Sequence, residues 1–277
     1  MDASSRIGRR TLLAVGGALP LAACVGGGGT SGSDPTGSGS GRLSYGDDPS
    51  QWAQRQVPEG PSRGTVVVIH GGFWRARYGA DLGEPLAQDL TARGWTTLNV
   101  EYRRVGNGGG FPQTFDDVHA ALELVQGPGP VVTLGHSAGG HLAAWAAGRL
   151  RTGEWTGQVE VTHVISQAGV LDLTAAYRAG LGSGAVHDLL GVGPEDPRYD
   201  LVDPRRQVPL EVPLWAVHAP DDGQVPISQS VDYVAAATAA GGDAELAEVT
   251  GGHFDLIDVD SAAWTRIVQI LDGISPA

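Results

Sequence analysis

Residues Val131–Trp145 read VVTLGHSAGGHLAAW. Apolar and β-branched residues lead into a serine between glycines, and an alanine-rich stretch follows, so the segment predicts a strand, a tight turn and a helix. In that order, G-x-S-x-G forces the serine side chain out at the edge of a sheet, and small neighbours prevent backbone clashes. The pattern makes Ser137 the candidate nucleophile.

A second match shows that the motif alone is not specific. Residues Gly60–Gly64 read GPSRG and also fit G-x-S-x-G. This match precedes a predicted strand and no helix follows it, whereas Ser137 follows a strand and opens a helical segment. The context therefore favours Ser137 over Ser62.

Strand-like and helix-like segments alternate from Thr65 onward. The runs that predict strands are Thr65–His70, Trp95–Tyr102, Val131–His136, Val161–Gln167, Val212–His218 and Ala244–Val249. The segments with helical periodicity are Asp81–Arg93, Phe115–Gln126, Ala138–Leu150, Pro226–Ala240 and Ser261–Asp272. Short apolar strands separated by helices predict an α/β fold, with a mostly parallel sheet covered by helices on both faces.

One long segment, residues 172–209, interrupts this alternation. It holds two weak helical patterns and a stretch rich in proline and aspartate. A connection of this length is usually functional, so we expect a small cap over the site; a surface elaboration without function is the alternative.

A serine hydroxyl needs a base to become nucleophilic at neutral pH. Of the eight histidines, only His253 lies beyond the sixth predicted strand, in a loop that Gly251 and Gly252 leave free to approach the strand ends. The acid that orients this histidine should follow a strand between the two, and Asp221 and Asp222 both do so directly after VPLWAVH. The spacing leaves both carboxylates open. The chain order of serine, aspartate and histidine is that of one particular triad scaffold.

Acyl transfer also needs N–H donors for the developing oxyanion. Residues His70–Trp74, HGGFW, follow a predicted strand, and a glycine turn at a strand end leaves such donors unpaired. We expect the N–H groups of Gly72, Phe73 and Ala138 to form the oxyanion hole. Phe73, Trp74 and the 172–209 segment are expected to shape the substrate pocket.

These motifs together resemble the α/β-hydrolase superfamily, from about Thr65 to the C-terminus. The stretches IHGGFWR, NVEYRR, LGHSAGGHLAAW, HAPDDGQVPISQS and GGHF stand in the usual order of that superfamily. H-G-G-x-W with G-H-S-A-G-G-H-L-A is similar to the esterase/lipase branch that includes feruloyl and acetylxylan esterases and kynurenine formamidase-like enzymes. The absence of a third glycine after HGG departs from hormone-sensitive-lipase-like esterases.

The resemblance implies acyl hydrolysis through an acyl-enzyme, without a metal or an organic cofactor. Its H-G-x-x-D-x-x-V-P pattern, laid over His218–Pro226, implies Asp222 as the triad acid, although Ala219 replaces the usual glycine. Asp221 is the second choice. His70 is interpreted as holding the oxyanion loop and not as a base.

The N-terminal residues predict export. Residues 1–23 combine a basic start with a short apolar run and resemble a twin-arginine signal. The residues before Cys24, the only cysteine, resemble the lipobox of bacterial lipoproteins. Residues 24–44 are rich in glycine and serine and are expected to form a flexible tether to a catalytic domain at 45–277. We therefore expect a protein that is lipid-anchored at the outer face of the bacterial cytoplasmic membrane, or secreted.

Charge limits the partners. The formal net charge is −13, and the basic residues are all arginine and form no stripe for nucleic acid. We expect an ester substrate with short acyl, acetyl or feruloyl-type groups, and membrane contact only through the lipid at Cys24. An aryl-formamide amidase of the kynurenine type and a non-catalytic binding lipoprotein on the same fold are the alternatives.

Overall fold

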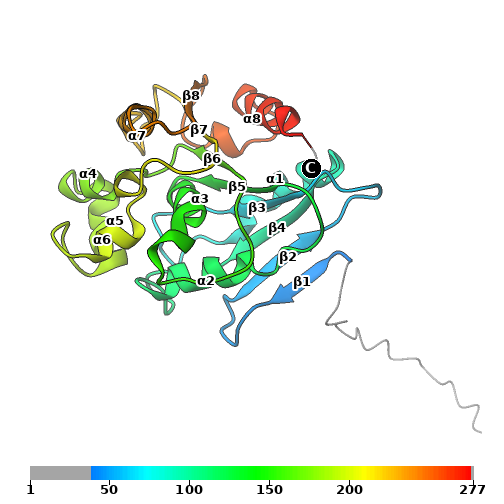
Figure 1. Cartoon of the computed structure of the whole chain (residues 1–277), viewed down its shortest axis with the longest axis horizontal. Helices are drawn as coiled ribbons and strands as arrows, with labels where there is room; N and C mark the ends of the chain where they lie inside the picture. The colour runs from blue at the N-terminus through cyan, green and yellow to red at the C-terminus, as the bar shows by residue number, and fades with distance from the viewer. Residues whose placement is uncertain (1–38, 276–277) are drawn as a thin grey trace, which may run out of the picture. The chain divides into compact units, whose positions relative to one another are not determined.

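A computed structural model describes residues 39–275 (Figure 1). The predicted export signal at 1–23, the predicted lipidation site Cys24 and tether residues 25–38 lie outside the described residues. Within residues 39–275, no helix is both long and apolar enough to cross a membrane.

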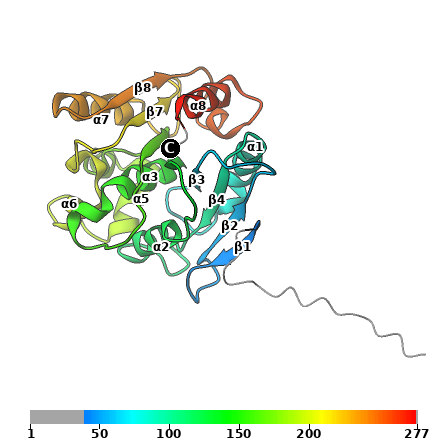
Figure 2. The same ribbon diagram turned by 45° about the vertical axis from the view of Figure 1, so that its right-hand side comes forward.

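The described residues form one eight-stranded sheet in the order β1-β2-β4-β3-β5-β6-β7-β8, and Figure 2 shows β1 and β8 far apart at its two ends. The strands are β1 (Gly41–Ser44), β2 (Trp52–Gln56), β3 (Thr65–Ile69), β4 (Thr96–Glu101), β5 (Val131–His136), β6 (His163–Gln167), β7 (Leu214–His218) and β8 (Ala244–Glu248). All pairs from β4 to β8 are parallel, whereas β1 and β2 are antiparallel to their neighbours. The six strands that the sequence predicts are all present, and the α/β fold class is confirmed.

Helices cover both faces of the sheet (Figure 1). The long helices of the alternating pattern are α1 (Glu84–Ala92), α2 (Gln113–Leu122), α3 (Ala138–Gly148), α7 (Ser228–Ala239) and α8 (Ala262–Gly273). In β3, Val66 and Val68 belong to the core under α1 and α8, whereas Val67 and Ile69 belong to the core under α2, α3 and α7. Both faces of β3 are buried, which explains its uninterrupted apolar sequence.

The folded chain begins earlier than the sequence predicts. We expected a flexible tether up to residue 44, but Gly41–Ser44 form β1, which pairs antiparallel with β2 from Gly41 opposite Arg55 to Ser44 opposite Trp52. Backbone hydrogen bonds between β1 and β2 set this boundary, and a glycine- and serine-rich composition does not reveal such bonds.

The 172–209 segment contains α4 (Leu173–Arg178), α5 (Leu181–Leu190), α6 (Arg198–Val202) and the 3₁₀ turn η3 (Pro204–Arg206). The start of α5 is not regular helix, because Gly182, Ser183 and Gly184 have positive φ angles. The segment packs beside α3, where Trp145 Nε1 donates to the Leu201 carbonyl at 3.2 Å. Whether it acts as a cap stays a prediction.

Candidate active site

Ser137 lies at the sharp turn between β5 and α3. Its φ of 56° and ψ of −117° are rare for a residue with a side chain, and such strain marks a nucleophile elbow. The Ser137 N–H donates to the Gln167 carbonyl of β6 at 2.8 Å, which ties the turn to the sheet. The Ser137 side chain makes no capping hydrogen bond to α3, and within residues 39–275 no hydrogen bond joins its hydroxyl to His253 or to another side chain.

The glycines around Ser137 are required by close backbone contacts. A Cβ on Gly135 would lie 2.0 Å from the Gly139 carbonyl oxygen, and a Cβ on Gly139 would lie 2.0 Å from that of Ile69. No side chain fits at either position. The G-x-S-x-G spacing is therefore a packing requirement of this elbow.

Ser62, in the second motif, has a different environment. Its hydroxyl donates to the Gly64 carbonyl at 2.7 Å and accepts from the Thr96 N–H at 3.1 Å. The Ser62 hydroxyl therefore holds the loop before β3 in place, and its proton is donated to the Gly64 carbonyl. The structural context separates the two serines as the sequence context does.

His253 and Asp222 form a buried hydrogen bond. His253 Nδ1 lies 2.7 Å from Asp222 Oδ2, and their side chains are 6% and 0% exposed. A carboxylate accepts, so Nδ1 carries the proton and Nε2 is left as the free acceptor. The His253 ring lies 4.4 Å, centroid to centroid, from the ring of His136, the residue before Ser137. The three candidate catalytic residues thus belong to one edge of the sheet.

The hydrogen bonds of Asp222 keep its carboxyl group ionised. Burial alone would raise the pKa of Asp222, but hydrogen bonds from His218, from His253 and from the N–H groups of Val225 and Gln224 lower it well below its ordinary value. Asp221, the second choice, is exposed. The geometry favours Asp222 as the partner of His253, in agreement with the motif.

The turn after β3 presents unpaired backbone donors. Gly72, Phe73 and Trp74 all have positive φ angles, of 110°, 52° and 55°. In residues 39–275, the N–H groups of Gly72, Phe73 and Ala138 make no hydrogen bond to the protein. A Cβ on Gly72 would lie 2.4 Å from the Tyr78 ring, so this position also requires glycine. Unpaired donors at this edge are what an oxyanion hole requires.

Contacts of His70 hold the start of this turn in place. Its ring stacks on Tyr102 with the centroids 4.4 Å apart, and the Tyr102 hydroxyl donates to the His70 carbonyl at 2.9 Å. His70 Nδ1 donates to the Gly71 carbonyl at 2.8 Å. These contacts suit the predicted structural role of His70.

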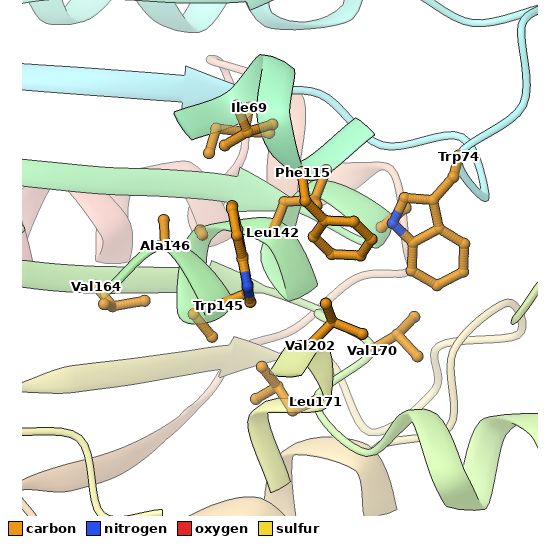
Figure 3. Packing of buried hydrophobic residues seen from close by; sticks show 14 of the residues in the cluster. Ile69, Trp74, Phe115, Leu142, Trp145, Ala146, Val164, Val170, Leu171 and Val202 are labelled. Atoms are coloured by element: carbon orange, nitrogen blue, oxygen red, sulfur yellow. The ribbon is translucent and has the colours of Figure 1, made fainter. Parts of the chain in front are cut away.

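Trp74 is not at an open surface. Its side chain is 0% exposed and packs in the core with Phe115 and Leu142 (Figure 3). We expected Trp74 to help shape the substrate pocket, but a completely buried ring reaches a ligand only if the turn moves. The apolar area that Trp74 buries is large enough to draw its side chain inward.

Phe73 and Arg75 connect the turn after β3 to the 172–209 segment. A Cβ on Gly182 would lie 2.5 Å from the Phe73 ring, so the two are in close contact. Arg75 forms an ion pair with Asp188 at 3.0 Å and donates to the Ser183 carbonyl at 3.3 Å. The segment therefore borders the candidate site.

Sequence reasoning missed the role of His136. Its Nε2 donates to the main-chain carbonyl of His253 at 2.9 Å, which ties the histidine loop to the elbow. Burial is the main cause that lowers the pKa of His136 to about 3, so the ring is neutral at pH 7. Its position beside Ser137 is visible in the sequence, but its contact with His253 exists only in the fold.

In the part of the chain that the structure describes, no cluster of three or more histidine, cysteine, aspartate or glutamate side chains is arranged to hold a metal ion.

The fold and the elbow define the class of protein as an α/β-hydrolase. The model of the BD-FAE family matches residues 56–236, which is more than half of the chain. The chain belongs to the BD-FAE family.

Individual relatives agree with this class. The chain is 36% identical over 101 residues to neutral cholesterol ester hydrolase 1 from Bos taurus, a match that covers 31% of this chain and only 24% of that protein. Among solved structures, it is similar to a truncated carbohydrate esterase from gut microbiota, with a TM-score of 0.68, 20% identity, and coverage of 83% of this chain and 94% of the other. Esterase B from Lactobacillus rhamnosis gives a TM-score of 0.71 at 19% identity, with 83% and 82% covered.

Proposed function

We propose that the protein hydrolyses carboxylic esters with a Ser137–His253–Asp222 triad. The observation that carries the proposal is the buried 2.7 Å hydrogen bond between His253 Nδ1 and Asp222 Oδ2, beside a strained serine whose hydroxyl is free. Membership of the BD-FAE family and the esterases among its structural relatives support it.

In the first half-reaction, His253 Nε2 takes the Ser137 proton as the serine oxygen attacks the ester carbonyl. The new C–O bond converts the carbonyl oxygen to an oxyanion, which the N–H groups of Gly72, Phe73 and Ala138 stabilise. The tetrahedral intermediate collapses, and His253 gives its proton to the departing alcohol. Asp222 remains ionised and stabilises the imidazolium, as its lowered pKa requires.

In the second half-reaction, water attacks the acyl-enzyme. His253 again removes a proton, and the carboxylic acid leaves as the Ser137 hydroxyl is restored. We propose short acyl, acetyl or feruloyl-type esters as substrates, outside the cytoplasm and with a lipid on Cys24.

Hydrolysis of p-nitrophenyl acetate tests the proposal. The wild-type protein is expected to release p-nitrophenol with a burst of about one equivalent per active site when deacylation is slow. Ser137→Ala should lower kcat by on the order of 10⁶-fold, whereas Ser62→Ala should retain activity. Full activity of Ser137→Ala would refute the assignment, and faster turnover of N-formylkynurenine than of any short ester would favour an amidase.

A further inference from the structure

Asp222 is held by two histidines. His218, the last residue of β7, has its Nε2 3.4 Å from Asp222 Oδ2, the same oxygen that lies 2.7 Å from His253 Nδ1. The side chains of His218 and Asp222 are both 0% exposed. Asp222 Oδ1 accepts from the N–H groups of Gln224 at 2.8 Å and Val225 at 2.9 Å. Both oxygens of the carboxylate therefore have partners, and none of them is solvent.

The protonation of His218 follows from its neighbours. Its Nε2 lies 3.0 Å from the Val225 carbonyl, and a carbonyl only accepts, so Nε2 carries the proton. In the neutral ring Nδ1 then accepts, and the Ser230 hydroxyl at 2.7 Å donates to it. Ser230 lies in the first turn of α7 and is 0% exposed. Ser230 thus selects the tautomer of His218 with its proton on Nε2, and this single N–H donates to the Val225 carbonyl at 3.0 Å, with Asp222 Oδ2 as a second, longer contact at 3.4 Å.

We propose that His218, oriented by Ser230, is a positioning residue for the triad acid. This inference rests on the proposed function. The Nε2 edge of His218 lies against Asp222 Oδ2 and donates to the carbonyl of Val225, whose own N–H donates to Asp222 Oδ1. The ring thereby restrains rotation of the carboxylate, so that Oδ2 stays directed at His253 Nδ1. His218 does not touch the substrate and acts only through Asp222.

The consequence should appear in the chemical step. His253 becomes an imidazolium only while Ser137 attacks and while water attacks, and a misdirected Asp222 would fail to stabilise it at those moments. Loss of His218 should therefore lower kcat and leave KM nearly unchanged. If His218 were only structural, its loss would lower kcat by the same factor whether or not Asp222 is present.

The first variant is His218→Phe, which keeps a ring in the buried space and removes the donor. We expect kcat for p-nitrophenyl acetate to fall by about 10- to 100-fold, with KM within about twofold, because small misplacements of catalytic groups have effects of this size. His163→Phe is the matched control. His163 begins β6, is half-buried and stacks on Trp215, so kcat should stay at the wild-type value.

A double-mutant cycle with Asp222→Asn separates positioning from general damage. In the Asp222→Asn background, adding His218→Phe should lower kcat by less than about threefold, because the carboxylate on which His218 acts has already been removed. An undiminished loss in the Asp222→Asn background would overturn the proposal.

Ser230→Ala keeps the test decisive if His218→Phe does not fold. It removes only the hydroxyl that orients the ring, and kcat should fall by about three- to tenfold. If Ser230→Ala and any folded His218→Phe protein keep the wild-type kcat, the inference about His218 is overturned. The proposed function survives this result as long as the activity of the wild-type protein is lost in Ser137→Ala. Esterase activity that does not depend on Ser137 would overturn the proposed function itself.

Discussion

His253 Nδ1 and Asp222 Oδ2 lie 2.7 Å apart in a region that solvent scarcely reaches, although 31 residues separate them in the chain. β7 and β8 are adjacent and parallel, so the loops that follow them meet at the carboxyl edge of the sheet. The ring of His253 is thereby fixed in one tautomer with Nε2 free.

Asp222→Asn should reduce kcat by up to about 10⁴-fold, because the amide can no longer stabilise the imidazolium or hold the correct tautomer of His253. The neighbouring Asp221→Asn is the matched control, since Asp221 is exposed. It should stay within about twofold of wild type. Steady-state kinetics on p-nitrophenyl acetate measures both, and a larger loss at Asp221 would assign the acid to that residue.

Gly72→Ala should impair the oxyanion turn. The residue has a φ of 110°, and its Cβ would lie 2.4 Å from the Tyr78 ring, so the turn must shift. We expect a fall in kcat of about 10²- to 10³-fold, the size of losing one oxyanion donor. Gly223→Ala has open space around its Cβ and should be tolerated. Equal activity of the two variants would argue against an oxyanion role for this turn.

Phe254→Ala should change substrate preference. Phe254 is 61% exposed and its ring lies 5.3 Å from that of His253, so a substrate bound near His253 can contact Phe254 without a rearrangement of the fold. We expect kcat/KM to fall more for esters with large apolar groups than for methyl acetate, at unchanged thermal stability. Val231→Ala removes the other exposed large hydrophobic side chain of the described region and should have no such effect. A uniform loss across all esters would contradict a binding role.

His141→Phe should make stability less dependent on pH. Burial is the main cause that lowers the pKa of His141 to about 4, while an unfolded histidine titrates near about 6.5. Between these values the unfolded state binds a proton that the folded state does not, so the free energy of unfolding falls as pH falls from about 6.5 to about 4. This histidine contributes a slope that approaches about 1.4 kcal/mol per pH unit.

Urea unfolding from pH 7 to pH 5 measures that slope. The His141→Phe protein should be less stable than wild type at pH 7, because the hydrogen bond from Nε2 to the Val202 carbonyl is lost. Its stability should then decline less on acidification. Identical slopes for the two proteins would show that His141 does not titrate as its burial requires.

The periodic parts of the fold could be predicted from the sequence. The apolar runs locate β3 to β8, and helical periodicity locates α1, α2, α3, α7 and α8 to within a few residues. β1 could not be found, because four residues with alternating partial burial carry no apolar signal. The left-handed start of α5 depends on Gly182–Gly184, whose conformation composition does not reveal.

The candidate site divides in the same way. Ser137, Asp222 and His253 follow strands, and parallel strands bring their carboxyl ends together. Sequence order and strand position were enough to nominate Ser137, His253 and the pair Asp221 and Asp222, and the family pattern was needed to choose Asp222. His136, His218 and Ser230 act through contacts across the fold, which spacing does not encode. Trp74 was expected to help shape the pocket, whereas its large apolar ring is buried in the core.

Covalent labelling of the nucleophile tests the central claim most directly. The wild-type protein is incubated with diethyl p-nitrophenyl phosphate, which phosphorylates activated serines, and the intact mass and the peptides are then measured. We predict one diethylphosphoryl group per chain, located on Ser137, with a parallel loss of esterase activity and no adduct on Ser137→Ala or on denatured protein. An adduct on another residue that abolishes activity, or retained labelling of Ser137→Ala, would contradict the account.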